Sequence, residues 1–301
     1  MVRDRDNPTV ITRVLIHLDK IVSRSRTATY LSQKMRFNSL RDQLLKILYP
    51  GQTFEWDVQG VTFNLFDPRL IYRKRLLRSG HVYEESVSHL LREAANSYSA
   101  PIFIDVGAHY GYHTVFFSKL VGQRGRVIAF EPNSFAFDTL LKNLEINEIG
   151  GDETVAVKAA LSDQEGLAKV IGASDGGGQT VAVHNLHDDA TVQTFTLDKY
   201  CNDHAICPDI VKIDVQGSEV NVIKGMSGIL KSDVSEVLCE IHQVIGNVGA
   251  REVVSLLQDA GMEIFELKDF RGAGPDLVKL SDHATDLLGQ NREIMVYARR
   301  V

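Results

Sequence analysis

The chain has 301 residues, of which 44% are hydrophobic and 24% are charged, and this composition excludes a chain that is disordered throughout. The formal net charge of -6 argues against general nucleic-acid binding by the whole chain. The length suffices for one large domain with an appendage or for two modest ones.

The first 50 residues differ in charge from the rest of the chain. They carry ten Lys/Arg and four Asp/Glu, a net of +6, so the remaining residues sum to -12. Two interpretations are open: a surface-docking arm, or a solvated helical face that contacts the acidic body, which is our expectation. Apolar spacing predicts helices over 9–22 and 38–48, and these helices offer a contact surface for a homodimer.

Several sequence features bear on the cellular compartment. No uninterrupted apolar run approaches the length of about 20 residues that spans a bilayer. The N-terminus, Met-Val-Arg-Asp-Arg-Asp, lacks the apolar core of a signal peptide. Cys201, Cys207 and Cys239 form no pair at metal-ligand spacing and fit a reducing compartment. We therefore expect a cytoplasmic protein with no transmembrane segment and no nucleic-acid partner.

The hydrophobic period changes after residue 50. Apolar and polar residues alternate over 54–66 around Gln59-Gly60, which predicts a β-hairpin. A helix is predicted over 83–96. We therefore divide the chain into a helical and hairpin extension, 1–80, and a second domain, 81–301.

From Pro101 onward, buried strands alternate with helices, which is typical of an α/β fold whose mostly parallel sheet is covered on both faces. The segment 165–196 is predicted to form an antiparallel excursion around Gly176-Gly-Gly178. The helix over 134–146 is expected to turn Phe135, Leu140, Leu141 and Leu144 inward. The predicted strands are 102–106, 126–131, 154–159, 209–214, 234–241, 262–266 and 293–299, and the further helices are 111–121, 218–225 and 249–260.

A glycine-containing turn, Asp105-Val-Gly-Ala-His-Tyr-Gly111, joins the first of these strands to its helix. Open α/β sheets bind ligands at this kind of junction, where glycines let a ligand approach the backbone and a helix N-terminus offers N–H groups. A carboxylate at Asp105 can anchor a cationic amine, which suits an amino acid better than a pyrophosphate.

Two further strand ends carry acids that suit a nucleoside. Glu131 follows Gly111 by twenty residues and ends the second strand, where a carboxylate accepts hydrogen bonds from both ribose hydroxyls. Ser162 and Asp163 follow the third strand, where they either bond an adenine edge or form a capped turn.

Polar groups at the next two strand ends face one cleft: Asp214, Glu240 and His242. Asp214 lies where the reacting group of a bound cofactor is expected, and a histidine suits general-base work near neutral pH. A divalent metal held by the three is conceivable, but no tight ligand spacing demands one, and we predict none.

Taken in order, these segments resemble the FkbM family of S-adenosylmethionine (SAM)-dependent methyltransferases between about Tyr83 and His242. The segments that carry the resemblance are Tyr83-Glu84, Ile104–Thr114, Val127–Asn133, Asn143 with Asn147, Ala160–Asp163, Thr196-Leu-Asp198, Ile210–Glu219 and Gly225.

The resemblance implies a class I methyltransferase sheet with an antiparallel last strand, SAM as cofactor, and methylation of a hydroxyl on a small molecule or glycan. The implied cofactor contacts are Glu84, Asp105, Gly107, Ala108, His109, Gly111, Tyr112, Glu131, Pro132, Asn133, Ser162, Asp163 and Asp214. His242, Asp214 and Glu240 are the expected catalytic residues.

The sequence departs from the family at two positions. Asn is usual where His109 stands, and Glu is usual where Gln216 stands, so a carboxylate is missing near the reacting centre. Two alternatives therefore stay beside the O-methyltransferase: a non-catalytic SAM-binding or assembly protein, and a nicotinamide-dinucleotide enzyme. The loop lacks the G-x-G-x-x-G of a dinucleotide site, which disfavours the latter.

Overall fold

The computed structural model describes residues 53–68, 83–172, 178–182, 191–242, 248–270, 274–280 and 293–300. The chain divides into two compact units, Met1–Tyr83 and Glu84–Val301. The helices predicted over 9–22 and 38–48 lie outside the described residues, as do residues 173–177 and 183–190 of the predicted antiparallel excursion.

The first unit contains the predicted hairpin. Strands β1 (Thr53–Val58) and β2 (Val61–Phe66) pair antiparallel around Gln59 and Gly60. Both turn residues have positive φ, 53° and 81°, as a two-residue type I′ turn requires. Alternate side chains are buried, namely Trp56, Val58, Phe63 and Leu65.

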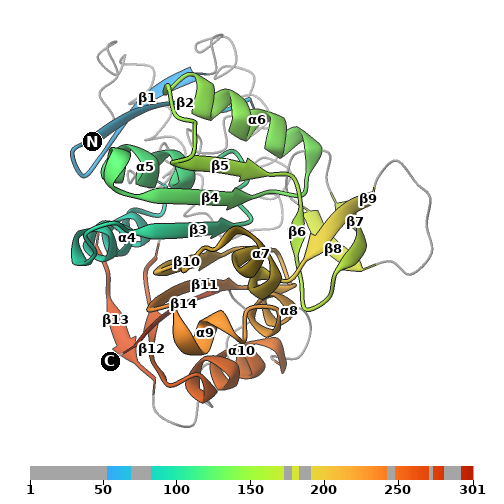
Figure 1. The fold of residues 1–301 in the computed structure, drawn as a ribbon. Helices are drawn as coiled ribbons and strands as arrows, with labels where there is room; N and C mark the ends of the chain where they lie inside the picture. Colours follow the sequence, from blue (N-terminus) through green and yellow to red (C-terminus); the bar gives the residue numbers. More distant parts are fainter. Residues whose placement is uncertain are drawn as a thin grey trace, which may run out of the picture. The chain divides into compact units, whose positions relative to one another are not determined.

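The second unit is built on an eight-stranded sheet whose order is β13-β12-β14-β11-β10-β3-β4-β5 (Figure 1). The strands from β11 to β5 are parallel, whereas β14 lies antiparallel between β11 and β12. The mostly parallel sheet and its antiparallel last strand are thus as predicted. The strand bounds are β3 Ile102–Val106, β4 Arg126–Phe130, β5 Thr154–Val157, β10 Ile210–Ile213, β11 Glu236–Ile241, β12 Met262–Leu267, β13 Leu277–Lys279 and β14 Ile294–Arg300.

The helices in the described part of this unit are α4 Glu85–Ser97, α5 Tyr112–Val121, α6 Ser134–Glu145, α7 Leu197–His204, α8 Glu219–Lys224, α9 Ile229–Ser232 and α10 Val248–Asp259, with a 3₁₀ turn η1 at Gly122–Arg124. One apolar core is formed by helices α7, α8, α9 and α10 and by one face of the strands, which includes Ile104 and Val106. The opposite face carries Phe103, whose ring lies 4.5 Å from that of Phe117 on α5. Because strand side chains alternate, Asp105 shares this second face with Phe103.

A second, four-stranded sheet has the order β6-β9-β7-β8 and stands apart from the first in Figure 1. Its strands are β6 Ala160–Leu161, β7 Gly166–Gly172, β8 Gly178–Ala182 and β9 Thr191–Phe195. Strand β7 pairs antiparallel with both β8 and β9, so the predicted antiparallel excursion is confirmed.

For the predicted elements that lie within the described residues, the bounds differ from the observed ones by at most two residues. The predicted inward face of the helix over 134–146 was partly wrong. Leu140 and Leu144 of α6 are buried, whereas Phe135 and Leu141 are 40% and 45% exposed. Leu140 and Leu144 are four positions apart and therefore share one face of the helix, whereas Phe135 and Leu141 lie off that face. In the described part of the chain, no helix combines the length and the apolar character needed to cross a bilayer.

Candidate functional site

The neighbouring parallel strands β3, β10 and β11 carry polar side chains at their carboxyl ends. Asp105 belongs to β3, Asp214 follows β10, and β11 supplies Glu240 and then His242 one residue beyond its end. In the register, Lys212 of β10 lies directly beside Asp105. The topology therefore gathers charges that lie far apart in the sequence.

The turn after β3 requires glycine at its first position. Gly107 has φ +82°, and a Cβ on it would lie 1.9 Å from the carbonyl oxygen of Asp214. The backbone N–H groups of Gly107 and Ala108 both donate to the carbonyl of Phe130, at 2.9 and 3.0 Å. The turn is thus held against the ends of both neighbouring strands.

Gly111 ends this turn and is the N-cap of α5. It has φ +83°, and a Cβ there would lie 2.4 Å from Leu140 Cδ1. The side chain of Asn143 donates to the carbonyl of Tyr110 at 2.7 Å and ties α6 to the same turn. Both predicted glycines therefore have a steric reason.

Glu131 follows β4 and is buried beside the turn. Its two carboxylate oxygens each accept one backbone hydrogen bond of 2.8 Å, from His109 and from Asn133. His109 adopts φ +53°, which aims its N–H in this way. Burial raises the pKa of Glu131 to about 7, although these backbone donors oppose the rise.

Asp105 is 1% exposed and takes part in a buried charge group. Its Oδ2 accepts a 2.6 Å hydrogen bond from Thr114, while Oδ1 has no hydrogen-bond partner among the described residues and lies 3.9 Å from Lys212 Nζ. Burial raises the pKa of the Asp105 carboxyl, and Lys212 opposes that shift.

Lys212 is 3% exposed and lies between two carboxylates, with its Nζ 3.5 Å from Asp214 Oδ2. Burial alone lowers the pKa of Lys212, but Asp214 and Asp105 outweigh this effect and raise it above its ordinary value. The lysine is therefore charged, and it compensates acids that the fold has removed from water.

Glu84 is the N-cap of α4, has φ +44° and is 1% exposed. Its Oε2 lies 3.8 Å from Nε2 of the buried His113. Burial, followed by the charge of Lys212, lowers the pKa of His113 well below its usual range, so this imidazole is neutral. Glu84 thus adds another acid to the buried face of the sheet.

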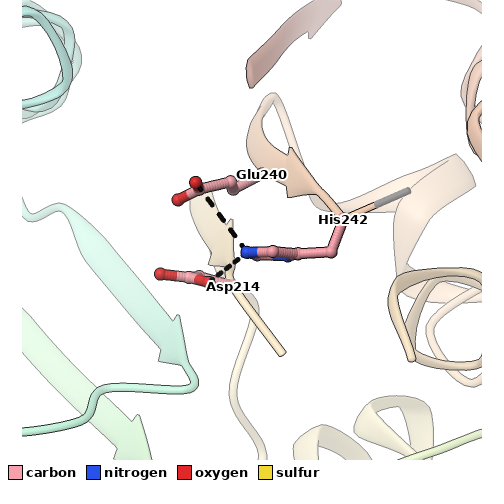
Figure 2. Close-up of side chains that lie close together, drawn as sticks. All are labelled: Asp214, Glu240 and His242. Atoms are coloured by element: carbon pink, nitrogen blue, oxygen red, sulfur yellow. Dashed lines mark ion pairs between the residues drawn. The ribbon is translucent and has the colours of Figure 1, made fainter. Parts of the chain in front are cut away.

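At the outer end of this group, His242 lies between Asp214 and Glu240 (Figure 2). Its Nε2 is 3.8 Å from Asp214 Oδ1 and 3.8 Å from Glu240 Oε1. The three side chains offer ligand atoms that all lie within 4.8 Å of one another. The Gln216 amide nitrogen stands 2.8 Å from Nε2 and 3.3 Å from Asp214 Oδ1.

Burial lowers the pKa of His242, but a hydrogen bond to Glu219 and the charges of Asp214 and Glu240 outweigh it and raise the pKa. Burial and the charge of Asp214 likewise raise the pKa of Glu240. The negative charge of Asp214 contributes to both shifts, whereas burial acts on the two groups in opposite directions. Two carboxylates around one imidazole thus favour a positive charge at this place.

Glu219, in the first turn of α8, was not among the predicted site residues. Its Oε1 accepts from His242 Nδ1–H at 2.9 Å and from the backbone N–H of Gly217 at 2.8 Å. This bond fixes the ring proton on Nδ1 and turns Nε2 toward the two carboxylates. The signal was present in the sequence, as an acid at the start of the helix that follows the Asp214 strand end.

Ser162 and Asp163 were predicted to follow the third strand of the main sheet, but that strand, β5, ends at Val157. They directly follow β6, a strand of the second sheet. Ser162 Oγ donates to Asp163 Oδ1 at 3.1 Å. A Cβ on Gly225 would lie 2.0 Å from the Ser162 carbonyl oxygen, so this segment packs closely against the end of α8. Asp163 itself is exposed.

The other predicted cofactor residues lie on the turn or at a helix start. Tyr112 is the first residue of α5 and is 1% exposed, while Pro132 and Asn133 lie between β4 and α6. The Asn133 side chain accepts from the N–H of Ala136 and caps α6. Asn133 thus has a structural role besides any contact with a ligand.

Together, the strand order with one antiparallel strand between β11 and β12 and the acid-lined strand ends define a class I methyltransferase fold. A family model described as the methyltransferase FkbM domain matches residues 105–264. The chain belongs to the FkbM methyltransferase family.

Among similar proteins is the hexuronic acid methyltransferase AglP of Haloferax volcanii, which is 30% identical over 196 residues, or 63% of this chain and 72% of AglP. Methyltransferase sdnD of Sordaria araneosa is 23% identical over 237 residues, or 65% of this chain and 90% of sdnD. Among solved structures, methyltransferase FkbM from Methylobacillus flagellatus has 14% identity and a TM-score of 0.45, over 66% of this chain and 44% of that protein.

Proposed function

We propose that this protein is a SAM-dependent O-methyltransferase that acts on a hydroxyl group of a small metabolite or glycan, with a sugar as the favoured acceptor. The observation that carries the proposal is the convergence of Asp214, Glu240 and His242 at two strand ends beside the glycine turn. The similarity to a hexuronic acid methyltransferase supports the sugar.

The residues around the turn suit SAM. Asp105 Oδ1 is buried with no hydrogen-bond partner in the described chain, and an acid here suits the cationic amino-acid end of the cofactor. The absent Cβ of Gly107 leaves room for close approach to the backbone. Each Glu131 oxygen accepts one backbone N–H, so its second lone pair stays available for a ribose hydroxyl.

When bound, SAM supplies a methyl group on a positively charged sulfur. In the proposed reaction this methyl group would pass from sulfur, which would keep the electron pair of the broken bond, to the acceptor oxygen, whose hydroxyl proton would be lost. His242 in its neutral form is our proposed acceptor for this proton, because the bond from Nδ1–H to Glu219 leaves Nε2 as the proton-accepting atom. Since the surrounding acids raise the pKa of His242, we expect a higher pH to favour this form. Orientation of the hydroxyl at this cluster accounts for much of the expected rate.

SAM titration by calorimetry tests the cofactor site. We expect Asp105→Ala and Glu131→Ala to weaken SAM binding by about tenfold or more, since each removes a charged partner (about 1.4 kcal/mol per tenfold). Asp203→Ala removes an exposed acid on α7 and serves as the matched control. SAM affinity equal to that of the wild type in both Asp105→Ala and Glu131→Ala would contradict the proposal.

A second candidate function is a SAM-binding or assembly protein without catalysis, and Gln216 favours it. This residue stands where the family usually has Glu, and its amide points at Asp214 and His242. Transfer of labelled methyl groups to extracts and to uronic-acid-containing glycans separates the two candidates. Any labelled acceptor that depends on His242 rules out the non-catalytic one.

A further inference from the structure

We propose that Asp214, Glu240 and His242 form a binding site for one divalent cation of the first transition row, such as Mn²⁺. The inference deepens the proposed function, and its role in methyl transfer depends on that function. The existence of the site does not, because cation binding is measured without any transfer.

The first argument is the geometry of the three ligand atoms. Metal–ligand bonds of about 2.1 Å place two ligands of one ion at most about 4.2 Å apart. His242 Nε2 lies 3.8 Å from Asp214 Oδ1 and 3.8 Å from Glu240 Oε1, so both pairs already fall within this limit. The three side chains point toward one another from β11 and from the loop after β10 (Figure 2). Two carboxylates with one imidazole suit such an ion.

The second argument comes from Glu219, which lies outside the cluster. A histidine that binds a metal nearly always donates its other N–H to a carboxylate or carbonyl, which fixes the tautomer and the ring orientation. Glu219 is 3% exposed and accepts from His242 Nδ1–H at 2.9 Å. It is also fixed by the N–H of Gly217. A base-positioning role needs the same bond, so the decisive evidence is the cation itself.

The third argument is the surroundings of the cluster. The positive charge of Lys212 on β10 already lies between Asp105 and Asp214. Glu84 and Glu219 add acids on the inner side. At present the Gln216 amide nitrogen, an uncharged donor, stands between Nε2 and Asp214 Oδ1. Rotation of this amide would present its oxygen to a bound cation as a further ligand.

A cation at this place has a clear use in the proposed reaction. A hydroxyl oxygen bound to it loses its proton more readily, since the cation stabilises the resulting alkoxide. With the ion bound, Nε2 of His242 is a ligand and no longer the proton acceptor, and the proton passes to water or to a carboxylate oxygen that is not bound to the ion. Neighbouring sugar hydroxyls would suit the open coordination positions.

Titration of the EDTA-treated, dialysed full chain with Mn²⁺, followed by calorimetry or electron paramagnetic resonance, tests the site. We expect one saturable Mn²⁺ per chain, with affinity at least about tenfold weaker in Asp214→Asn and Glu240→Gln and about tenfold weaker in Glu219→Gln. Glu252→Gln, which removes an exposed acid of α10, should match the wild type. No saturable binding, or equal affinity in Asp214→Asn and wild type, overturns the site.

A gain-of-function variant decides the matter if the loss variants do not fold. Gln216→Glu places a carboxylate beside Asp214 and His242, and we expect it to bind Mn²⁺ at least about tenfold more tightly than the wild type. Equal or weaker affinity contradicts the inference.

The same EDTA-treated sample separates this inference from the proposed function. SAM binding and methyl transfer without any Mn²⁺ binding overturn the cation site alone. Mn²⁺ binding without methyl transfer to any acceptor overturns the proposed function alone.

Discussion

Gly107 faces the carbonyl oxygen of Asp214 so closely that a Cβ on residue 107 would lie 1.9 Å from it. The turn after β3 and the end of β10 are thus in direct backbone contact at the proposed methyl-transfer position. A side chain at residue 107 has to push apart the two segments that shape the site.

Gly107→Ala is therefore expected to destabilise the fold by about 3 kcal/mol and to abolish SAM binding. The loss combines a left-handed backbone, about 1–2 kcal/mol, with steric overlap of similar size. Urea unfolding and SAM titration measure the two effects.

Gly261→Ala is the matched control, because Gly261 has nearly the same φ, +80°, and no atom within 4 Å of an added Cβ. It should cost about 1 kcal/mol, from the backbone alone. Equal losses in the two variants would contradict the role of the Asp214 contact.

Glu131 predicts a pH dependence of cofactor binding. Its pKa of about 7 means that the carboxylate needed by the ribose hydroxyls is partly protonated at neutral pH. SAM affinity should fall several-fold between pH 8 and pH 6, which calorimetry at both values measures. Glu131→Gln should bind weakly with little pH dependence, and an equally steep pH dependence in that variant would assign the effect to another group.

The raised pKa of Glu131 affects the stability of the fold in the opposite direction from cofactor binding. A folded-state pKa above the unfolded one favours the protonated form, so this contribution to stability is complete below about pH 4.5 and is lost as the pH rises through about 7. Cofactor binding and fold stability are therefore expected to change in opposite directions over this range.

Local patterns explain why so much of the sheet was predictable. The strand over 102–106 and its glycine turn lie in one short segment. Its apolar run, its acid and its glycines each indicate the same junction between a buried strand and the following helix. Helix α7 was missed because Leu197 and Cys201 are its only buried residues among the eight it contains. The four residues of α9 are too few to show a helical period.

Contacts between side chains of different strands and helices could not be predicted from the sequence. Lys212 reads as one polar residue within an apolar strand, and only the register places it beside Asp105. Glu219 and His242 are 23 residues apart, and their bond depends on how α8 meets the end of β11. The predicted cofactor and catalytic residues therefore remain predictions about roles, although the fold brings several of them together.

Asp198, in the segment Thr196-Leu-Asp198 that carries the family resemblance, is expected to stabilise the fold without contributing to cofactor binding. Its carboxylate accepts from the N–H groups of Gly228 and Ile229 at 2.8 and 2.9 Å and so caps α9. Asp198→Ala should cost about 1 kcal/mol in urea unfolding, as lost caps do, while SAM affinity stays unchanged. Asp203→Ala, on the same helix α7, should leave the urea midpoint unchanged. A large loss of SAM affinity in Asp198→Ala would give this residue a role in the site.

Lys212→Met tests the buried charge group. The substitution keeps the length of the side chain but leaves Asp105 and Asp214 without their shared cation, and one of them is 1% exposed. Removal of one partner from a buried ion pair costs about 3–5 kcal/mol, so we expect a loss of this size in urea unfolding. The exposed pair of Lys224 with Glu252 supplies the control, and Lys224→Met should leave the urea midpoint unchanged because solvent screens that pair. A loss below about 1 kcal/mol in Lys212→Met would mean that Asp105, whose pKa burial raises, is neutral in the folded variant, and raising the pH should then destabilise the variant more than the wild type.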